Sequence, residues 1–306
     1  MKVLVTGGAG FIGKHLTKFL LEKGYDITIF DNFSNSEKAD VSFLVDMGAK
    51  IIEGDITDLQ SVVDVVKDHH LVVHLAAKIS VEESVKNPDE TFHVNVDGTK
   101  NLLIACKKNH VKKLIAASSA AVYGKGSENV KLTENSAMNP ISPYGESKVK
   151  MEAELRKFVL EDKIDCVILR FFNIFGDWQS PEYAGVITKF IKKIKDKESL
   201  EIFGDGKQTR DFISVNDVTN SIYCAINEEK VGTYNIASGK AVTINELATL
   251  MISLSGKNLS IKYIDSKKGD VKYSQADITL SEKEINFSPK SGLDEIEKLL
   301  ERNRLL

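Results

Sequence analysis

A glycine-rich turn near the start of the chain constrains the possible fold more than any other feature. The apolar, β-branched run Val3–Val5 precedes this turn, and the amphipathic stretch Phe11–Lys23 follows it. The turn reads GGAGFIG over Gly7–Gly13, and a turn this tight needs residues without a Cβ atom. The order of strand, turn and helix lets a pyrophosphate approach the backbone and rest on the positive end of the helix. The pattern predicts a dinucleotide site, although a glycine turn without a ligand could use the same residues.

An acidic residue at the right distance supports the dinucleotide interpretation. The apolar stretch Ile27–Phe30 predicts a second strand, and this strand ends at Asp31. A carboxylate at this place binds the ribose 2′-hydroxyl in dinucleotide folds. Because the same carboxylate would repel a 2′-phosphate, we expect NAD rather than NADP as the cofactor.

Predicted strands and helices alternate through the first half of the chain. The continuous apolar run Leu71–Leu75 is typical of a strand that is buried on both faces. Further strands are predicted at Ile51–Ile52, Leu114–Ala117 and Cys166–Leu169. This alternation predicts an α/β fold with a Rossmann-type, doubly wound parallel sheet, in which ligands bind beyond the carboxyl ends of the strands.

The second half of the chain predicts a smaller α/β domain that binds the substrate. The regular alternation fades after about Phe172, and a helix is predicted at Val186–Lys195. We expect the NAD-binding domain to comprise residues 1–171 plus about 212–237. The substrate-binding domain would then comprise about 172–211 and 238–306 and close over the substrate as a lid.

The composition excludes several other classes of protein. The 306 residues carry a formal net charge of −3, which gives no indication of binding to nucleic acid or to a membrane surface. Neither a signal peptide nor a membrane-spanning run is visible, and three widely spaced cysteines suggest buried thiols in a reducing compartment, so a cytoplasmic location is expected. The histidines show no metal-ligand spacing, and the adjacent pair His69–His70 is predicted to lie on the surface.

Tyr144 and Lys148 are the predicted catalytic pair, with Ser119 as their partner. Their spacing of four residues places both side chains on one face of a helix. A nearby ammonium, together with a positive nicotinamide ring, would lower the pKa of the phenol and make Tyr144 a base for a sugar hydroxyl. Ser119 ends a predicted strand, so its hydroxyl could hold the reacting oxygen. A Tyr–Lys pair on a solvated helix and a serine bonded to local backbone are the structural alternatives.

A series of motifs resembles one known family over nearly the whole chain. In order they are TGGAGFIG, GDI, HLAAK, SSAAVYG, SPYGESK, LRFFNIFG, GDGKQTRDFISVNDV and YNIASG. Together they are similar to the extended short-chain dehydrogenase/reductase family, and within it to nucleotide-sugar 4-epimerases such as UDP-glucose 4-epimerase. The resemblance implies that bound NAD takes a hydride from C4 of a UDP-sugar and returns it to the other face.

The resemblance also implies which residues form the site. The implied NAD contacts are Gly7, Gly10, Phe11, Ile12, Gly13, Asp31, Asn32, Asp55, Ile56, Ala76, Ala77, Lys78, Asn95, Tyr144, Lys148 and Phe171. The implied substrate contacts are Lys78, Ser80, Ser119, Ala120, Asn173, Val186, Phe203, Arg210, Lys267, Asp270 and Ser274. No metal ligand is implied. Arg210 suits a pyrophosphate chemically, because its guanidinium can donate two parallel hydrogen bonds.

Two departures from the family pattern bear on the reaction. Related 4,6-dehydratases carry Asp-Glu after the catalytic Thr, whereas this chain has Ala120 and Ala121 there, which cannot perform acid–base chemistry. Lys267 stands where the family has arginine, and lysine keeps the charge but loses the bidentate geometry. The sequence therefore argues against a dehydratase.

Ser274 bears on the identity of the sugar. In the resembling epimerases this position borders the pocket for the C2 substituent, and a small residue admits an N-acetyl group. We therefore expect interconversion of UDP-N-acetylglucosamine and UDP-N-acetylgalactosamine, with UDP-glucose and UDP-galactose also accepted. Another nucleotide-sugar oxidoreductase, such as a 4-ketoreductase or a UDP-glucuronate epimerase, and a non-catalytic NAD-binding regulator are the alternatives.

A homodimer is expected from the resemblance, which implies that two helices meet their symmetry mates as a four-helix bundle. The helices are predicted at Asp97–Asn109 and Glu146–Glu161. Their apolar residues exceed what a single core needs, and those proposed for the interface are Leu102, Leu103, Cys106, Met151, Leu155 and Phe158.

Overall fold

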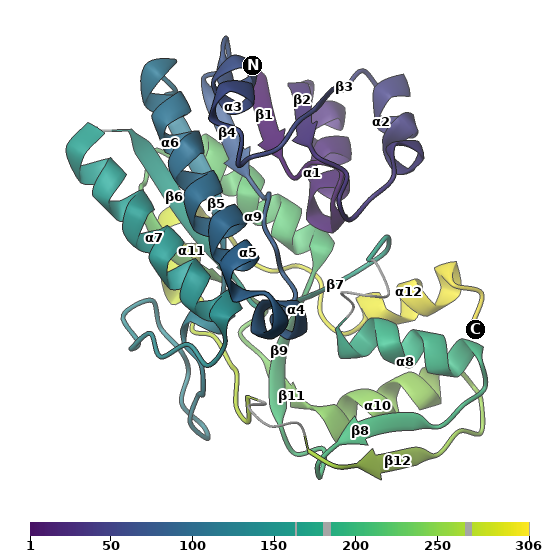
Figure 1. Cartoon of the computed structure of the whole chain (residues 1–306). Coiled ribbons are helices and arrows are strands. Elements are labelled where there is room, and N and C mark those ends of the chain that lie inside the picture. Colours follow the sequence, from purple (N-terminus) through teal and green to yellow (C-terminus); the bar gives the residue numbers. More distant parts are fainter. Residues whose placement is uncertain (163, 180–184, 267–270, 306) are drawn as a thin grey trace.

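A seven-stranded parallel sheet is the largest sheet of the computed structural model (Figure 1). The structure describes residues 1–162, 164–179, 185–266 and 271–305. Its strands follow the order β10-β6-β5-β4-β1-β2-β3. They are β1 (Lys2–Thr6), β2 (Asp26–Asp31), β3 (Lys50–Glu53), β4 (Leu71–His74), β5 (Lys113–Ser119), β6 (Asp165–Phe171) and β10 (Gly232–Ile236). The expected doubly wound α/β fold is confirmed.

The strand order fixes where a ligand can bind. β2 and β3 lie on one side of β1, whereas β4, β5 and β6 extend the sheet on the other side. The chain thus reverses its direction of growth between β1 and β4. In open α/β sheets the crevice for ligands lies at such a switch point, beyond the carboxyl ends of the strands.

Helices cover both faces of this sheet (Figure 1). Successive strand residues point to opposite faces, so Leu4 packs with α3 (Leu59–Val66), α6 (Gly98–Lys108) and α7 (Pro143–Asp162). Val3 and Val5 pack on the other face with α1 (Phe11–Glu22) and α9 (Val215–Asn227). The strands are therefore buried on both sides, as the continuous apolar runs predict.

A second group of elements packs around a separate apolar cluster. One sheet has the order β11-β9-β7, and β12 pairs with β8 in another. The strands are β7 (Asn173–Phe175), β8 (Leu200–Phe203), β9 (Thr209–Ser214), β11 (Ala241–Thr243) and β12 (Ile261–Ile264), and the helices are α8 (Val186–Lys195), α10 (Ile244–Leu254) and α12 (Glu295–Arg302). Helix α12 buries Ile296, Leu299 and Leu300, a spacing that places all three on one face.

Several shorter elements complete the structure. They are η1 (Lys38–Val41), α2 (Ser42–Asp46), α4 (Val81–Lys86), α5 (Pro88–Phe92), the π-helical turn η2 (His93–Asp97), η3 (Ala120–Val122) and α11 (Thr279–Ile285). Among the described residues, no helix is long and apolar enough to cross a membrane.

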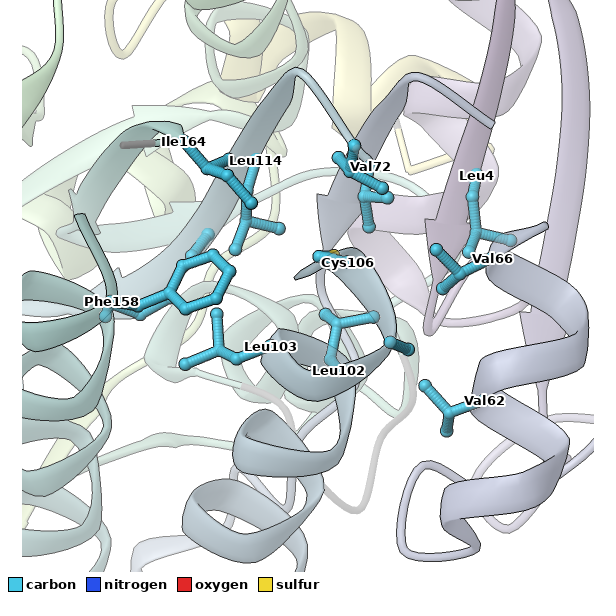
Figure 2. Close-up of a cluster of buried hydrophobic side chains, with 14 of the residues drawn as sticks. Leu4, Val62, Val66, Val72, Leu102, Leu103, Cys106, Leu114, Phe158 and Ile164 are labelled. Carbon is cyan, nitrogen blue, oxygen red and sulfur yellow. The ribbon is translucent and has the colours of Figure 1, made fainter. Parts of the chain in front are cut away.

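The residues proposed above for a dimer interface lie inside the protein's own core. Leu102, Leu103, Cys106 and Phe158 are at most 6% exposed and belong to the cluster between the sheet and helices α6 and α7 (Figure 2). Met151 and Leu155 are buried in the same cluster. They cannot also form an exposed interface, so this basis for a dimer is wrong, because helix periodicity cannot tell which neighbour an apolar face covers. Ile104 and Leu160 are the large apolar residues of these two helices that remain exposed.

Candidate active site

The glycine turn lies between β1 and α1, where the backbone leaves no room for side chains. Gly7 adopts a left-handed conformation with φ of +69°, and a Cβ atom there would lie 2.6 Å from the backbone nitrogen of Ala76. A Cβ atom on Gly13 would lie 2.4 Å from the carbonyl oxygen of Gly7. Gly10 at the N-cap has no side chain to occupy the first N–H groups of α1, which suits an anionic ligand.

Asp31 ends β2 beside this turn and is held by two backbone donors. Its carboxylate accepts hydrogen bonds from the N–H of Ala9 at 2.9 Å and from the N–H of Phe33 at 2.9 Å. Burial raises the pKa of Asp31, and these two bonds oppose the rise. The carboxylate is thus fixed at the end of the strand next to β1, where a ribose hydroxyl is expected.

Asn32 and Asp55 form a second polar group beyond β2 and β3. The Asn32 amide donates to the Asp55 carboxylate at 2.8 Å, and the Thr57 hydroxyl donates to it at 2.7 Å. Burial raises the pKa of Asp55, but the hydrogen bonds from Thr57 and Asn32 outweigh it and lower the pKa overall. Ile56, the next residue, is buried in the core.

Asn95 fixes the segment that follows β4. Its side chain accepts from the N–H of Lys78 at 2.8 Å and donates to the carbonyl of Lys78 at 2.9 Å. It also donates to the Ser147 hydroxyl at 2.9 Å, which ties the segment to α7. Asn95 lies in the π-helical turn η2, a distortion that often occurs at functional sites.

Ser119, Tyr144 and Lys148 line one cavity of about 530 Å³. Ser119 ends β5, and the other two side chains lie on the first turns of α7. The side chains of Ser119 and Tyr144 are hydrogen-bonded to each other. The Lys148 ammonium is buried and donates to the carbonyl of Ala117 at 2.9 Å. The structure therefore brings the three predicted catalytic residues together.

The pKa values of this group differ from the sequence-based expectation. Burial raises the pKa of Tyr144, although its hydrogen bond to Ser119 opposes the rise. Burial lowers the pKa of Lys148 to about 8, and the Glu152 carboxylate opposes that change. The side chains of this protein therefore do not by themselves give Tyr144 the lowered pKa expected of a base. A positive charge on the bound cofactor would have to supply it.

A buried ionic network lies directly behind the catalytic residues, and the sequence analysis did not identify it. Glu152 accepts from the Ser118 hydroxyl at 2.6 Å and from two nitrogens of Arg170 at 2.9 and 2.8 Å. Arg170 also donates to the Tyr123 hydroxyl at 2.8 Å. The available signal was the position of Glu152 four residues after Lys148, which places it on the same helix face.

The predicted substrate contacts Asn173, Val186, Phe203 and Arg210 line the same cavity. Val186 begins α8, so the positive N-terminal end of this helix faces the cavity. Four further polar or charged residues from this part of the chain also line it, and they are Gln179, Lys189, Glu201 and Gln208. Arg210, Lys189 and the start of α8 favour an anionic ligand, whereas Glu201 opposes it.

The remaining predicted residues are distributed as follows. Phe11, Ile12, Ala77 and Phe171 line the main cavity, whereas Lys78 and Ser80 line a small neighbouring pocket. The Lys78 ammonium pairs with Glu90 at 2.8 Å, and Ser80 caps helix α4. Ala120 begins η3 next to Ser119.

Of the three residues predicted near the sugar, one lies away from the cavity lining and two lie outside the residues that the structure describes. Ser274 is 7% exposed and is not among the described residues that line the cavity. Lys267 and Asp270 lie outside the described residues.

The predictions for the histidines and for metal binding concern other parts of the chain. His69 is buried and bonded to the Thr28 hydroxyl at 3.0 Å, so its predicted surface position is wrong. No group of acidic, His or Cys side chains within the described ranges could hold a metal ion.

Comparisons with known proteins point in the same direction. Residues 3–237 match the family described as the NAD dependent epimerase/dehydratase family. A putative UDP-glucose 4-epimerase of Methanocaldococcus jannaschii is 37% identical, and the match covers 96% of this chain and 95% of that protein. The structure of the UDP-N-acetylglucosamine 4-epimerase of Methanobrevibacter ruminantium M1, in complex with UDP-N-acetylmuramic acid, is 38% identical with a TM-score of 0.90 and covers 98% of this chain and 95% of that one. The structure of the Thermotoga maritima UDP-glucose 4-epimerase with UDP-glucose is 33% identical with a TM-score of 0.94 and covers 99% of each chain.

Proposed function

The chain belongs to the NAD dependent epimerase/dehydratase family, and from this premise we propose that it interconverts the C4 epimers of a UDP-sugar with NAD as cofactor. One observation carries the proposal. The hydrogen-bonded pair Ser119 and Tyr144, with Lys148, lines the same cavity as Arg210 and the start of α8. A UDP-sugar in this cavity would have its diphosphate near Arg210 and the start of α8, and its sugar ring near Tyr144.

The residues of the first crevice fit NAD. Gly10 leaves the first N–H groups of α1 without a side-chain cap and open to a pyrophosphate, and the half-buried Asp31 carboxylate keeps acceptor capacity for a ribose. The negative charge of Asp31 disfavours a 2′-phosphate. When bound, NAD would accept a hydride from the sugar C4 and give it back.

The protein's own residues would then handle the proton and the position of the sugar. Tyr144 would remove the proton from O4 while Ser119 holds the same oxygen by a hydrogen bond. Lys148, which is buried and charged below a pH of about 8, would hold the cofactor ribose and favour the phenolate. Ala120 and Ala121 offer no further acid or base beside Ser119, which agrees with an epimerase rather than a dehydratase.

We propose UDP-N-acetylglucosamine and UDP-N-acetylgalactosamine as the preferred pair, with the glucose pair also accepted. Two observations support this choice. Ser274 is a small residue at the position that borders the C2 substituent in the resembling epimerases, and a 38% identical structure is a UDP-N-acetylglucosamine 4-epimerase. Exclusion by size is a stronger filter than an unfilled pocket, so a small residue here admits both sugar pairs.

The experiment compares kcat/KM for both UDP-sugar pairs in wild type, Ser274→Tyr and Ser274→Ala. Ser274→Tyr should lose the N-acetylated activity and keep the glucose activity, whereas Ser274→Ala should keep both. Wild-type turnover of UDP-glucose alone, or an unchanged preference in Ser274→Tyr, would overturn the assignment of the sugar.

A second measurement separates an epimerase from a ketoreductase. The epimerase cycle regenerates its cofactor, so denaturing the purified protein should release NAD(H). Absence of any dinucleotide, with activity strictly dependent on added NAD(P)H, would contradict the proposed function.

A further inference from the structure

Asp211 is a fully buried carboxylate directly after Arg210 on β9. Its Oδ1 accepts from the backbone N–H of Ser238 at 2.9 Å and from the Ser238 hydroxyl at 2.6 Å, and its Oδ2 accepts from the N–H of Ala276 at 3.2 Å. The backbone N–H of Gly239 donates to it as well. One side chain thus joins β9, the turn after β10 and the segment before α11.

Two of these regions, β9 and the segment before α11, carry residues that we propose to contact the nucleotide sugar, and a third such residue, Asn173 on β7, bonds to Asp211 itself. Arg210 precedes Asp211, Ser274 lies two residues before Ala276, and the Asn173 amide donates to the carbonyl of Asp211 at 2.9 Å. Both Asn173 and Arg210 line the main cavity. The Asp211 carboxylate therefore ties the segment that bears Ser274 to the strand that bears Arg210, and the Asp211 backbone carbonyl ties the same strand to Asn173.

The negative charge of Asp211 lowers the free energy of unfolding, because the carboxylate is buried. Burial raises the pKa of Asp211 to about 6, and the hydrogen bonds from Ser238, Ala276 and Gly239 only partly oppose the rise. Because the folded pKa lies above the ordinary value, protonation stabilises the fold, and this stabilisation is lost as the pH rises through about 6. The charged residues of the segments packed around it are Arg210, Lys240 in the turn and Asp277 after Ala276, whereas β7 and β11 contribute none.

We propose that the Asp211 carboxylate is a positioning residue for the nucleotide sugar, because it holds the Ser274 segment and the 238–239 turn against the strand that bears Arg210. The inference rests on the proposed function, since the ligand is a UDP-sugar. A protonated Asp211 would present a hydroxyl to at least one backbone N–H and lose that hydrogen bond. Substrate affinity should therefore fall as the pH falls through the pKa of Asp211.

The test measures the Kd for UDP-N-acetylglucosamine by calorimetry in a Tyr144→Phe background, where turnover is blocked, at several pH values between about 5 and 8. The diphosphate of this ligand is esterified at both ends, so it lacks the ionisation near a pH of about 6 of a phosphate monoester. In this background we expect the Kd to rise about tenfold as the pH falls, which corresponds to the loss of a charged hydrogen bond. The variant Asp211→Asn should bind about tenfold more weakly at neutral pH, with little change across the range.

Asp217→Asn is the matched control. Asp217 is also a buried carboxylate with a raised pKa, and it accepts from the N–H groups of Lys290 and Ser291, but it does not line the cavity. This variant should keep the pH dependence of its parent. Ser238→Ala covers the case in which Asp211→Asn fails to fold. It removes one hydrogen bond to the carboxylate and should move the loss of affinity to higher pH.

Three results would overturn the inference. They are parent-like binding by Asp211→Asn, the same weakening in Asp217→Asn, and a pH dependence that persists in Asp211→Asn or is not shifted in Ser238→Ala. In the last case the titrating group would be another one, such as His15. A parent that binds neither UDP-N-acetylglucosamine nor UDP-glucose at any pH would overturn the proposed function as well. The two failures are therefore distinguishable.

Discussion

The variant Glu152→Gln tests how the buried network supports the catalytic side chains. The Glu152 side chain is fully buried between Ser118 and Arg170, and Arg170 is only 2% exposed. Removal of the carboxylate charge would leave the guanidinium buried and unpaired. Breaking a buried ion pair by removal of one partner costs about 3–5 kcal/mol, far more than the loss of a surface pair.

The size of the effect follows from the length of the chain. For 306 residues, an unfolding entropy of about 2.1 cal/mol/K per residue turns this cost into a fall in Tm of roughly 5–8 °C. The surrounding charges lower the folded pKa of Glu152 below its ordinary value of 4.5. Its stabilising contribution is therefore present above a pH of about 4.5 and is lost as the pH falls through the folded pKa. The Tm difference between wild type and Glu152→Gln should shrink in that acid range.

The assay is thermal unfolding followed by circular dichroism at several pH values, with Arg156→Gln as the control. Arg156 pairs with the same carboxylate, but its side chain is 41% exposed, so its removal should cost less than about 1 kcal/mol. Wild-type Tm in Glu152→Gln, or an equal loss in Arg156→Gln, would refute the account. So would a Tm difference between wild type and Glu152→Gln that grows as the pH falls below about 4.5.

Three further predictions concern catalysis, the cofactor and assembly. Tyr144→Phe should lower kcat by about 10²–10⁴-fold while sugar binding in calorimetry changes little, and near wild-type turnover would exclude Tyr144 as the base. Gly13→Ala should lose retained NAD(H) and stability, because its Cβ would meet backbone at 2.4 Å, whereas the Cβ of Gly185→Ala meets no described residue within 4 Å. Equal NAD(H) content in both variants would contradict this. Light scattering should show a homodimer at micromolar concentration, and a wild-type monomer would disprove this assembly. If α7 forms the contact, substitution of the exposed Leu160 by a charged residue should weaken the dimer.

The sequence alone was sufficient for features that depend on nearby residues. The glycine turn could be recognised because its residues need a positive φ or a close backbone contact within the turn itself. The apolar runs of β1 and β4 could be recognised because a strand that is buried on both faces carries no polar alternation. The spacing of Tyr144 and Lys148 places them on one helix face, and the structure brings both to one cavity with Ser119. The short helices α4 and α5 were not predicted, because fewer than two turns give too little periodicity to recognise.

Only the tertiary structure decided the features that depend on partners far along the chain. Whether the apolar faces of α6 and α7 meet their own sheet or a second copy is decided by packing, and Leu102 and Phe158 are buried in the protein's own core. The pKa directions of Tyr144 and Asp211 come from burial and from hydrogen bonds to Ser119 and to Ser238 and Ala276. Desolvation and hydrogen bonding act through space, so no local pattern of residues could have given the charge state of these groups.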